Sequence, residues 1–206
     1  MNIHTNKISI EIFSGLGNVS NVFTTAGWDA WTVDNNPKFN PKLCVDVLHL
    51  SRSMLPALCN FIWISVPCTT FSRAANPNHF KKITNKYRNY SYIPLTPAAC
   101  ESISLLRKSI EIINWFPGVP FVIENPVGRI QHMPSMRLLG HYRYFVNYFD
   151  FGTKYSKETY LFSNMWLPFE TKKYKVFAPG MSTVRSVEKR AEVPAKLATT
   201  IFNYLY

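Results

Sequence analysis

The chain is short of acidic residues, and this shortage shapes what it can bind. Aspartate and glutamate together number 12 against 23 lysines and arginines, so the formal net charge is +11 and the pI is near 9.6. A balance this basic points to an acidic partner, most often nucleic acid. The basic residues cluster in loops, which favours nucleic acid over a composition that serves solubility alone.

Cysteines are also few, and long apolar runs are missing. The four cysteines, Cys44, Cys59, Cys68 and Cys100, form no CxxC pair and no zinc spacing, so we expect neither a metal site nor a disulfide scaffold. No stretch approaches the ~18 apolar residues of a membrane span, and the N-terminus lacks the apolar core of a signal peptide. We therefore expect an intracellular protein, cytoplasmic or nuclear in a eukaryotic host, without a membrane partner.

What is present is an alternation of apolar strands with amphipathic helices. At 206 residues the chain is expected to form one domain, 1–206. The pattern predicts strands at 8–13, 28–33, 45–47, 61–64, 120–123, 144–151 and 159–162, and helices at 19–26, 50–60, 97–116 and from Pro194 onward. This order indicates an α/β fold with a mostly parallel sheet, helices on both faces and an antiparallel edge strand.

One stretch, 61–72 (FIWISVPCTTFS), organises the rest. Its apolar run suits a strand buried on both faces, and Pro67 should end that strand because it cannot donate a ladder hydrogen bond. Cys68 then stands just past the carboxyl end of a parallel strand, where ligands bind in open α/β sheets. The alternative is that Cys68 is one more small buried side chain.

A glycine-containing turn follows the first strand. Gly15 and Gly17 let the backbone bend sharply and let a ligand approach, although the same pattern also forms tight turns without a ligand. Asp34 stands at the tip of the next strand, where a carboxylate can accept hydrogen bonds from both hydroxyls of a ribose. Asp46, at the end of the third strand, could accept from an adenine amino group.

Glu124 follows the buried strand at 120–123 and should point into the same crevice. A partly buried glutamate can carry a proton near neutral pH, although it can also serve as a cap or a surface ion pair. A thiol and a carboxylic acid at neighbouring strand tips form a working pair of nucleophile and general acid.

Four segments together resemble the DNA (cytosine-5) methyltransferase family. The segment 13–17 is similar to the family's FxGxG cofactor motif, and 66–72 (VPCTTFS) is similar to its PPCQxFS nucleophile motif. The segment 124–126 (ENP) resembles its ENV motif. The tail at 193–198 (VPAKLA), with Ile201, is similar to the end of its last motif, GNAVPxxLAxxI.

The resemblance implies a Rossmann-like fold that binds S-adenosyl-L-methionine and methylates C5 of cytosine in DNA. Cys68 would add to C6 of a cytosine that has left the duplex, and Glu124 would protonate N3. The cofactor-binding residues that it implies are Phe13, Ser14, Gly15, Gly17, Asp34, Asn35, Asp46 and Pro67.

Two basic segments are expected to contact DNA. Residues 73–96 show no periodicity and are expected to form a mobile catalytic loop that closes over the DNA. The segment 164–193 is short and basic and stands where the family carries a target-recognition domain. The expected DNA-binding residues in or beside these segments are Ser72, Arg73, Lys81, Lys82, Lys86, Arg88, Lys172 and Lys173.

The chain also departs from the family pattern. Val66, Thr69 and Pro126 replace a proline, a glutamine and a valine of its motifs. A QxRxR motif is missing, and Arg129 or Arg143 is the candidate to take its place. These features describe a compact, viral- or phage-like member without a full target-recognition domain. A homodimer or a partner subunit could then supply target recognition.

Two other readings stay open. The chain could be a catalytically inactive relative that binds DNA or a partner protein. It could also be an enzyme that modifies C5 of a free pyrimidine nucleotide, although the strong positive charge favours a polymer as substrate.

Overall fold

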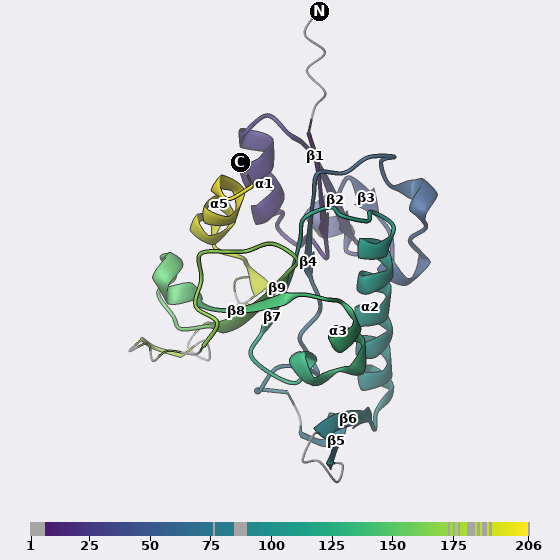
Figure 1. Cartoon of the computed structure of the whole chain (residues 1–206), viewed down its shortest axis with the longest axis vertical. Coiled ribbons are helices and arrows are strands. Elements are labelled where there is room, and N and C mark those ends of the chain that lie inside the picture. Colours follow the sequence, from purple (N-terminus) through teal and green to yellow (C-terminus); the bar gives the residue numbers. More distant parts are fainter. Residues whose placement is uncertain are drawn as a thin grey trace, which may run out of the picture.

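The structure is a computed structural model that describes residues 7–75, 77–84, 90–172, 174, 176, 178–180, 184, 186, 189 and 191–205. A seven-stranded sheet in the order β3-β2-β1-β4-β7-β9-β8 forms its centre (Figure 1). The strands are β1 Ile8–Ile12, β2 Asp29–Asp34, β3 Leu43–Cys44, β4 Phe61–Ser65, β7 Phe121–Pro126, β8 Tyr142–Asn147 and β9 Glu158–Ser163.

The sheet is mostly parallel, as the sequence predicts. The pairs β1–β2, β1–β4, β2–β3 and β4–β7 are parallel, whereas β9 is antiparallel to both β7 and β8 near one edge of the sheet. This arrangement is an α/β fold of the Rossmann-like type, in which the loops at the carboxyl ends of the parallel strands are the usual place for ligands.

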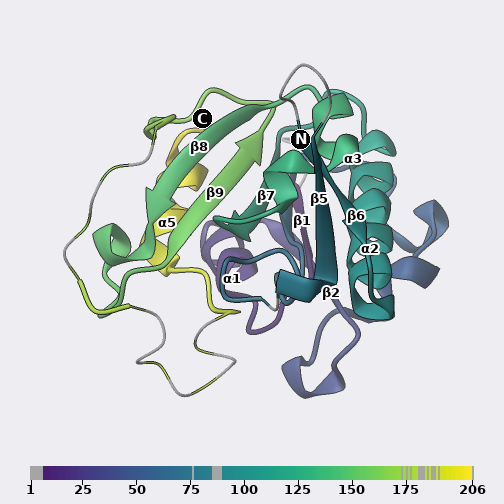
Figure 2. The same cartoon turned by 90° about the horizontal axis from the view of Figure 1, so that it is seen from below.

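Helices cover both faces of the sheet (Figure 2). On one face lie α2 Pro97–Asn114 and α3 Pro134–Leu138, and on the other lie α1 Asn18–Thr25 and α5 Ala195–Asn203. The apolar run of β4 explains why both faces are filled, since Ile62 and Ile64 pack in one core while Phe61 and Trp63 pack in the other.

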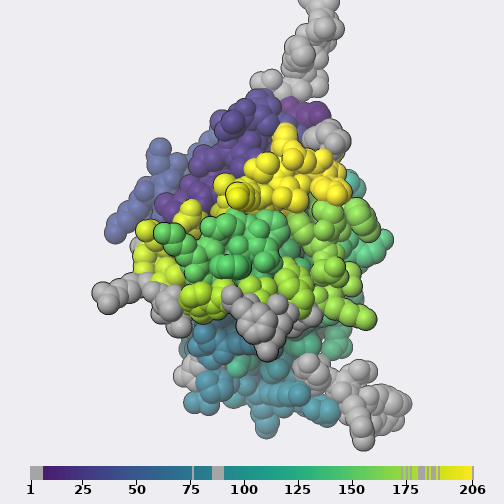
Figure 3. All heavy atoms as spheres, turned by 90° about the vertical axis from the view of Figure 1, so that its left-hand side faces the viewer, coloured from purple at the N-terminus to yellow at the C-terminus, as the bar shows by residue number. Residues whose placement is uncertain are grey.

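The first and last helices of the described chain lie side by side on one face of the sheet. In Figure 3 the yellow α5 lies beside the purple α1, and the Phe23 and Phe202 rings meet edge to face with centroids 5.1 Å apart. The tail helix predicted from Pro194 is thereby confirmed. Because α5 packs on α1, the segment before it is brought back to the carboxyl ends of the strands.

Several local predictions are wrong in instructive ways. The helix expected at 50–60 is absent, because Pro56 cannot sit in a helix interior; the stretch holds one short 3₁₀ turn, 52–54, and a second turn precedes it at 47–49. The third strand lies at Leu43–Cys44 rather than at 45–47. The stretch 73–96 is not without structure, since β5 Phe80–Thr84 and β6 Tyr90–Pro94 form an antiparallel pair.

No helix within the described residues is long and apolar enough to cross a membrane. The same part of the chain holds no group of three or more His, Cys, Asp or Glu side chains that could bind a metal ion.

Candidate active site

A cavity of about 550 Å³ opens at the carboxyl ends of β1, β2, β4 and β7. It is lined by residues from four of the segments that the sequence singles out. These are Phe13, Ser14 and Gly15 after β1, Asp34 of β2, Pro67, Cys68 and Ser72 after β4, and Glu124 of β7. The structure therefore brings the thiol, the carboxylic acid and the glycine turn to one hollow.

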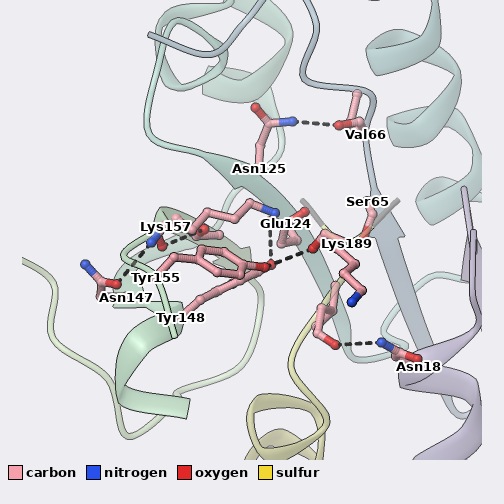
Figure 4. A network of polar contacts seen from close by, with 12 residues as sticks. Asn18, Ser65, Val66, Glu124, Asn125, Asn147, Tyr148, Tyr155, Lys157 and Lys189 are labelled. Carbon is pink, nitrogen blue, oxygen red and sulfur yellow. Dashed lines mark hydrogen bonds and ion pairs between the residues drawn. The ribbon is translucent and has the colours of Figure 1, made fainter. Parts of the chain in front are cut away.

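The register of the sheet sets the thiol segment beside the carboxylic acid. Ser65, the last residue of β4, is paired with Glu124 of β7 in the parallel ladder. The side-chain amide of Asn125 then donates a hydrogen bond of 2.7 Å to the carbonyl oxygen of Val66 (Figure 4). Cys68 follows two residues later, so the bond from β7 holds the start of its loop.

The far end of the Cys68 loop is held by the segment after β7. Ser72 forms a bridge with Gly128, and the Arg129 guanidinium donates to the carbonyl oxygens of Thr70 and Ser72 at 3.3 and 3.1 Å. A Cβ on Gly128 would lie 2.0 Å from the Phe71 carbonyl oxygen, so the close approach requires glycine. The loop is thus fixed at both ends.

Cys68 differs from the other cysteines in its surroundings. It is half-buried and lines the cavity, and it forms no disulfide. Cys59 is buried in the core, and burial raises the pKa of its thiol to about 12, which suits a structural role. Cys44 and Cys100 are exposed. Of the four, Cys68 is the one that lines the cavity.

Glu124 is buried in a small polar cluster that the sequence analysis missed. Its carboxylate is held at Oε1 by the Tyr148 hydroxyl, which donates a hydrogen bond of 2.7 Å, and by the Lys157 ammonium at 3.5 Å. Burial, followed by the negative charge of Glu124, raises the pKa of Tyr148 well above its ordinary value, so the phenol stays a donor. Figure 4 shows the three side chains pointing toward one another.

The turn after β1 bends sharply through left-handed backbone conformations. Phe13, Gly15 and Gly17 all have positive φ, at 58°, 49° and 68°. The Gly15 amide donates to Asp34 Oδ2 at 2.9 Å, and Asp34 Oδ1 accepts from the Asn36 amide at 2.9 Å. One carboxylate therefore fixes the turn while it still lines the cavity.

This end of the cavity has space for a ligand, and it also has a buried polar group without a hydrogen-bond partner in the described part of the chain. A Cβ built on Gly15 would meet no atom within 4 Å. The Ser14 hydroxyl is buried at the cavity wall and has no hydrogen-bond partner among the described residues. A buried hydroxyl without a partner is costly, so a bound ligand that satisfies it would be favoured. The residues thus fit a nucleoside-type cofactor.

Glu11 also lines the cavity and is absent from the sequence predictions. Its Oε2 accepts from the Ser20 amide at 2.7 Å, which places the carboxylate at the first turn of α1. Burial raises the pKa of Glu11 to about 7 despite these bonds, with a smaller contribution from the charge of Asp34. The sequence holds one sign that Glu11 is unusual: it is the charged residue within an otherwise uncharged strand, β1.

A second cavity of about 230 Å³ adjoins the first and shares Phe13, Pro67 and Thr69 with it. Asn35 and Asp46 line this second cavity rather than the first. Asp46 Oδ1 also accepts from the Leu48 amide at 2.9 Å. The predicted cofactor-binding residues are therefore divided between two adjoining hollows, except Gly17, which lines neither of them.

The residues predicted to bind DNA have varied surroundings. Arg73 is exposed and pairs with Glu158 at 3.2 Å, and Lys81 and Lys82 lie on the exposed β5. Arg143 stacks over the Tyr160 ring at 4.9 Å, and neither it nor Arg129 lines the cavity. Lys172 is exposed. Three of the predicted residues, Lys86, Arg88 and Lys173, lie outside the described residues.

The basic segment 164–193 returns to the cavity at its end. Ala191, Glu192 and Val193 line the hollow, and Glu192 Oε1 accepts from the Asn18 amide group at 2.8 Å. Earlier in the segment, the Phe145 amide donates to the Glu170 carbonyl oxygen at 2.6 Å. The segment therefore helps to wall the site.

Proteins similar to this chain are found by comparison of structures and not by comparison of sequences. No protein-family model matches the chain, and no curated protein matches it in sequence. The Entamoeba histolytica methyltransferase EhMeth matches with a TM-score of 0.52 and 14% identity, over 84% of this chain and 58% of that chain. This likeness shows a shared fold, and the chain spans only 58% of the length of that protein.

Two further solved structures match more weakly. The S. pombe Dnmt2 methyltransferase has a TM-score of 0.48 and 16% identity, over 83% of this chain and 51% of that chain. A Spodoptera frugiperda DNMT2 mutant has a TM-score of 0.48 and 15% identity, over 84% of this chain and 57% of that chain.

Proposed function

We propose that the protein transfers a methyl group from S-adenosyl-L-methionine to C5 of cytosine in DNA. The observation that carries the proposal is that Cys68 and Glu124, from adjacent parallel strands, line the same 550 Å³ cavity as the glycine turn and Asp34. The Rossmann-like fold shared with EhMeth, a methyltransferase, and the four motif resemblances support it.

The proposed cofactor would occupy the end of the cavity at the glycine turn. Gly15 leaves room there, and the Ser14 hydroxyl and the Asp34 carboxylate are the polar groups that would bind it. Asp46 and Asn35, in the adjoining hollow, would contact its base. When bound, S-adenosyl-L-methionine supplies the electrophilic methyl group that C5 takes up.

Cys68 and Glu124 would act on the cytosine ring. The Cys68 thiolate forms a bond to C6 while Glu124 delivers a proton to N3, and the electron pair of the C5–C6 bond becomes available at C5. After methylation C5 loses its proton to solvent, the Cys68–C6 bond breaks, and the N3 proton returns to Glu124. The ring regains its aromaticity and both side chains return to their starting state.

The substrate is proposed to be a DNA strand rather than a free nucleotide. A net charge of +11 attracts a polyanion much more strongly than a single phosphate. Because a base inside a duplex cannot reach Cys68, the target cytosine would leave the stack and enter the cavity.

The experiment is adduct trapping on DNA that contains 5-fluorocytosine, in the presence of S-adenosyl-L-methionine. Fluorine at C5 cannot leave as a cation, so the Cys68–C6 bond should persist and shift the protein on a denaturing gel. We expect the shift with the wild-type chain and none with Cys68→Ala. A shift that survives Cys68→Ala, or no shift with the wild type, would refute the proposal.

A further inference from the structure

We infer that Lys157, together with Tyr148, positions Glu124 for proton transfer and supplies the positive charge beside that carboxylate. The inference rests on the proposed function and adds two residues to it. Neither residue belongs to the motifs quoted above, and neither is Arg129 or Arg143, the residues predicted to take the place of the missing QxRxR motif.

Burial is the first argument. Lysine is almost never buried unless it is paired, yet the Lys157 side chain is 4% exposed, as is that of Glu124. The ammonium lies 3.5 Å from Glu124 Oε1 and 4.4 Å from the centre of the Tyr148 ring. Its charge is therefore directed at the one carboxylate that the proposed mechanism uses.

The backbone around Lys157 holds the side chain in place. The Lys157 amide donates to Asn147 Oδ1 at 3.2 Å, and its carbonyl oxygen accepts from the Tyr148 amide at 3.1 Å. The Asn147 side chain also donates to Ser156 Oγ at 2.7 Å. These bonds join the end of β8 to the start of β9, so Tyr148 and Lys157 are fixed relative to each other.

Charge balance in the cavity is the second argument. Glu11, Asp34, Glu124 and Glu192 line the hollow, and Lys157 is the one lysine or arginine among the described lining residues. When Glu124 delivers its proton to N3 it becomes a carboxylate, and the ammonium of Lys157 stabilises the negative charge that then remains on it. The Arg129 guanidinium donates its hydrogen bonds to carbonyl oxygens of the Cys68 loop and does not line the cavity, so it does not supply this charge.

The two contacts on Glu124 also orient its carboxyl group for the reaction. The Tyr148 hydroxyl and the Lys157 ammonium both contact Oε1 of Glu124. Two contacts on one oxygen fix the plane of the carboxyl group, and the second oxygen, Oε2, is the one that would meet N3 of the base. Lys157 and Tyr148 are thus positioning residues, which act through Glu124.

The test is the release of tritium from C5 of cytosine in duplex DNA, measured without a methyl donor. Cys68 adds to C6, Glu124 protonates N3, and C5 takes a proton from water and loses the tritium; the Cys68–C6 bond then breaks and the N3 proton returns to Glu124. We expect Lys157→Met to lower the maximal exchange rate by about 100-fold or more, in the range of general acid catalysis, with little change in the DNA concentration at half-maximal rate. Lys157→Arg should recover at least about tenfold over Met because it restores the charge.

Two further variants sharpen the result. Tyr148→Phe removes one hydroxyl and should slow exchange by about tenfold, the loss of one hydrogen bond to a charged group. Lys108→Met is the matched control, because Lys108 pairs with Glu111 on α2 at 2.8 Å, away from the cavity, and it should exchange at the wild-type rate.

Wild-type exchange in Lys157→Met, or Lys157→Arg as slow as Lys157→Met, would overturn the inference. If Lys157→Met does not fold, Tyr148→Phe decides, and an unchanged rate in that variant overturns it. If the wild-type chain releases no tritium, the proposed function fails and the inference fails with it, which is a distinct result.

Discussion

Asn125 donates a 2.7 Å hydrogen bond to the carbonyl oxygen of Val66, and this bond joins the strand that carries Glu124 to the loop that carries Cys68. Asn125 is fully buried, so the bond is shielded from water. The relationship explains how a nucleophile and an acid from strands far apart in sequence keep a fixed separation.

Replacing Asn125 with leucine should disturb both stability and the site. The Val66 carbonyl would lose its partner, which costs about 1–3 kcal/mol for a buried acceptor. Urea unfolding measures the loss, and the adduct assay should show slower trapping by the folded protein. Asn21→Leu, at an exposed position of α1, is the control and should change neither quantity.

Gly128→Ala should displace the Cys68 loop. The new Cβ would lie 2.0 Å from the Phe71 carbonyl oxygen, which is backbone and cannot move aside cheaply. We expect a loss of about 3 kcal/mol in thermal or urea unfolding, the upper end of overpacking costs. Gly118→Ala has a positive φ but meets nothing within 4 Å, so it should lose only about 1–2 kcal/mol. Equal losses in the two variants would contradict the clash.

The ion pair between Lys157 and Glu124 should show in stability as well as in rate. Removing one partner of a buried pair leaves an unpaired charge, so Lys157→Met should lose about 3–5 kcal/mol. The double variant Lys157→Met with Glu124→Gln removes both charges and should recover a large part of this loss. Urea unfolding of the four members of the cycle measures the coupling. A strictly additive cycle would show that the pair is not coupled.

Glu11 should make the free protein less stable as the pH rises. Its pKa is raised from 4.5 to about 7 in the folded state, so the folded state binds more protons between these values. Stability is then greatest below pH 4.5 as far as this group is concerned, and roughly 3 kcal/mol is lost as the pH rises through 7. Urea midpoints from pH 4.5 to 8 should show this decline in wild type and in Glu101→Gln, an exposed control. In Glu11→Gln the decline should be much smaller, and an unchanged slope would contradict the assignment.

Much of the fold was predictable because burial leaves a clear pattern in the sequence. The run FIWI of β4 could only fill a strand with a core on each face, and Thr96-Pro97 marks the start of α2 with the Thr96 hydroxyl accepting from the Ala99 amide. The fold class, with its parallel sheet and helices on both faces, follows from such segments and is confirmed.

The β5–β6 pair was not predictable from periodicity. β5 has one buried residue, Phe80, followed by four exposed ones, so the alternation typical of a half-buried strand is missing. Its place comes from tertiary contacts instead, since Phe80 stacks on Phe71 with ring centroids 5.8 Å apart. Strands that are stabilised this way leave little trace in the local sequence.

The candidate site was predictable in part, and the reason is the same. Cys68, Glu124, Gly15 and Asp34 stand at strand ends, and the topology of a parallel sheet gathers such ends at one edge. Lys157 gave no signal, because one more lysine in a basic chain looks like a surface residue. Only the fold brings it beside Glu124.

Transfer of label from methyl-labelled S-adenosyl-L-methionine is the measurement that decides whether the protein methylates cytosine in DNA with Cys68 as the nucleophile. Duplex DNA is incubated with the wild-type chain, digested to nucleosides and separated, with free dCMP as a parallel substrate. We expect label in 5-methyldeoxycytidine from DNA with the wild type and none with Cys68→Ala. Label on another base, label on dCMP alone, or equal label with Cys68→Ala would contradict it.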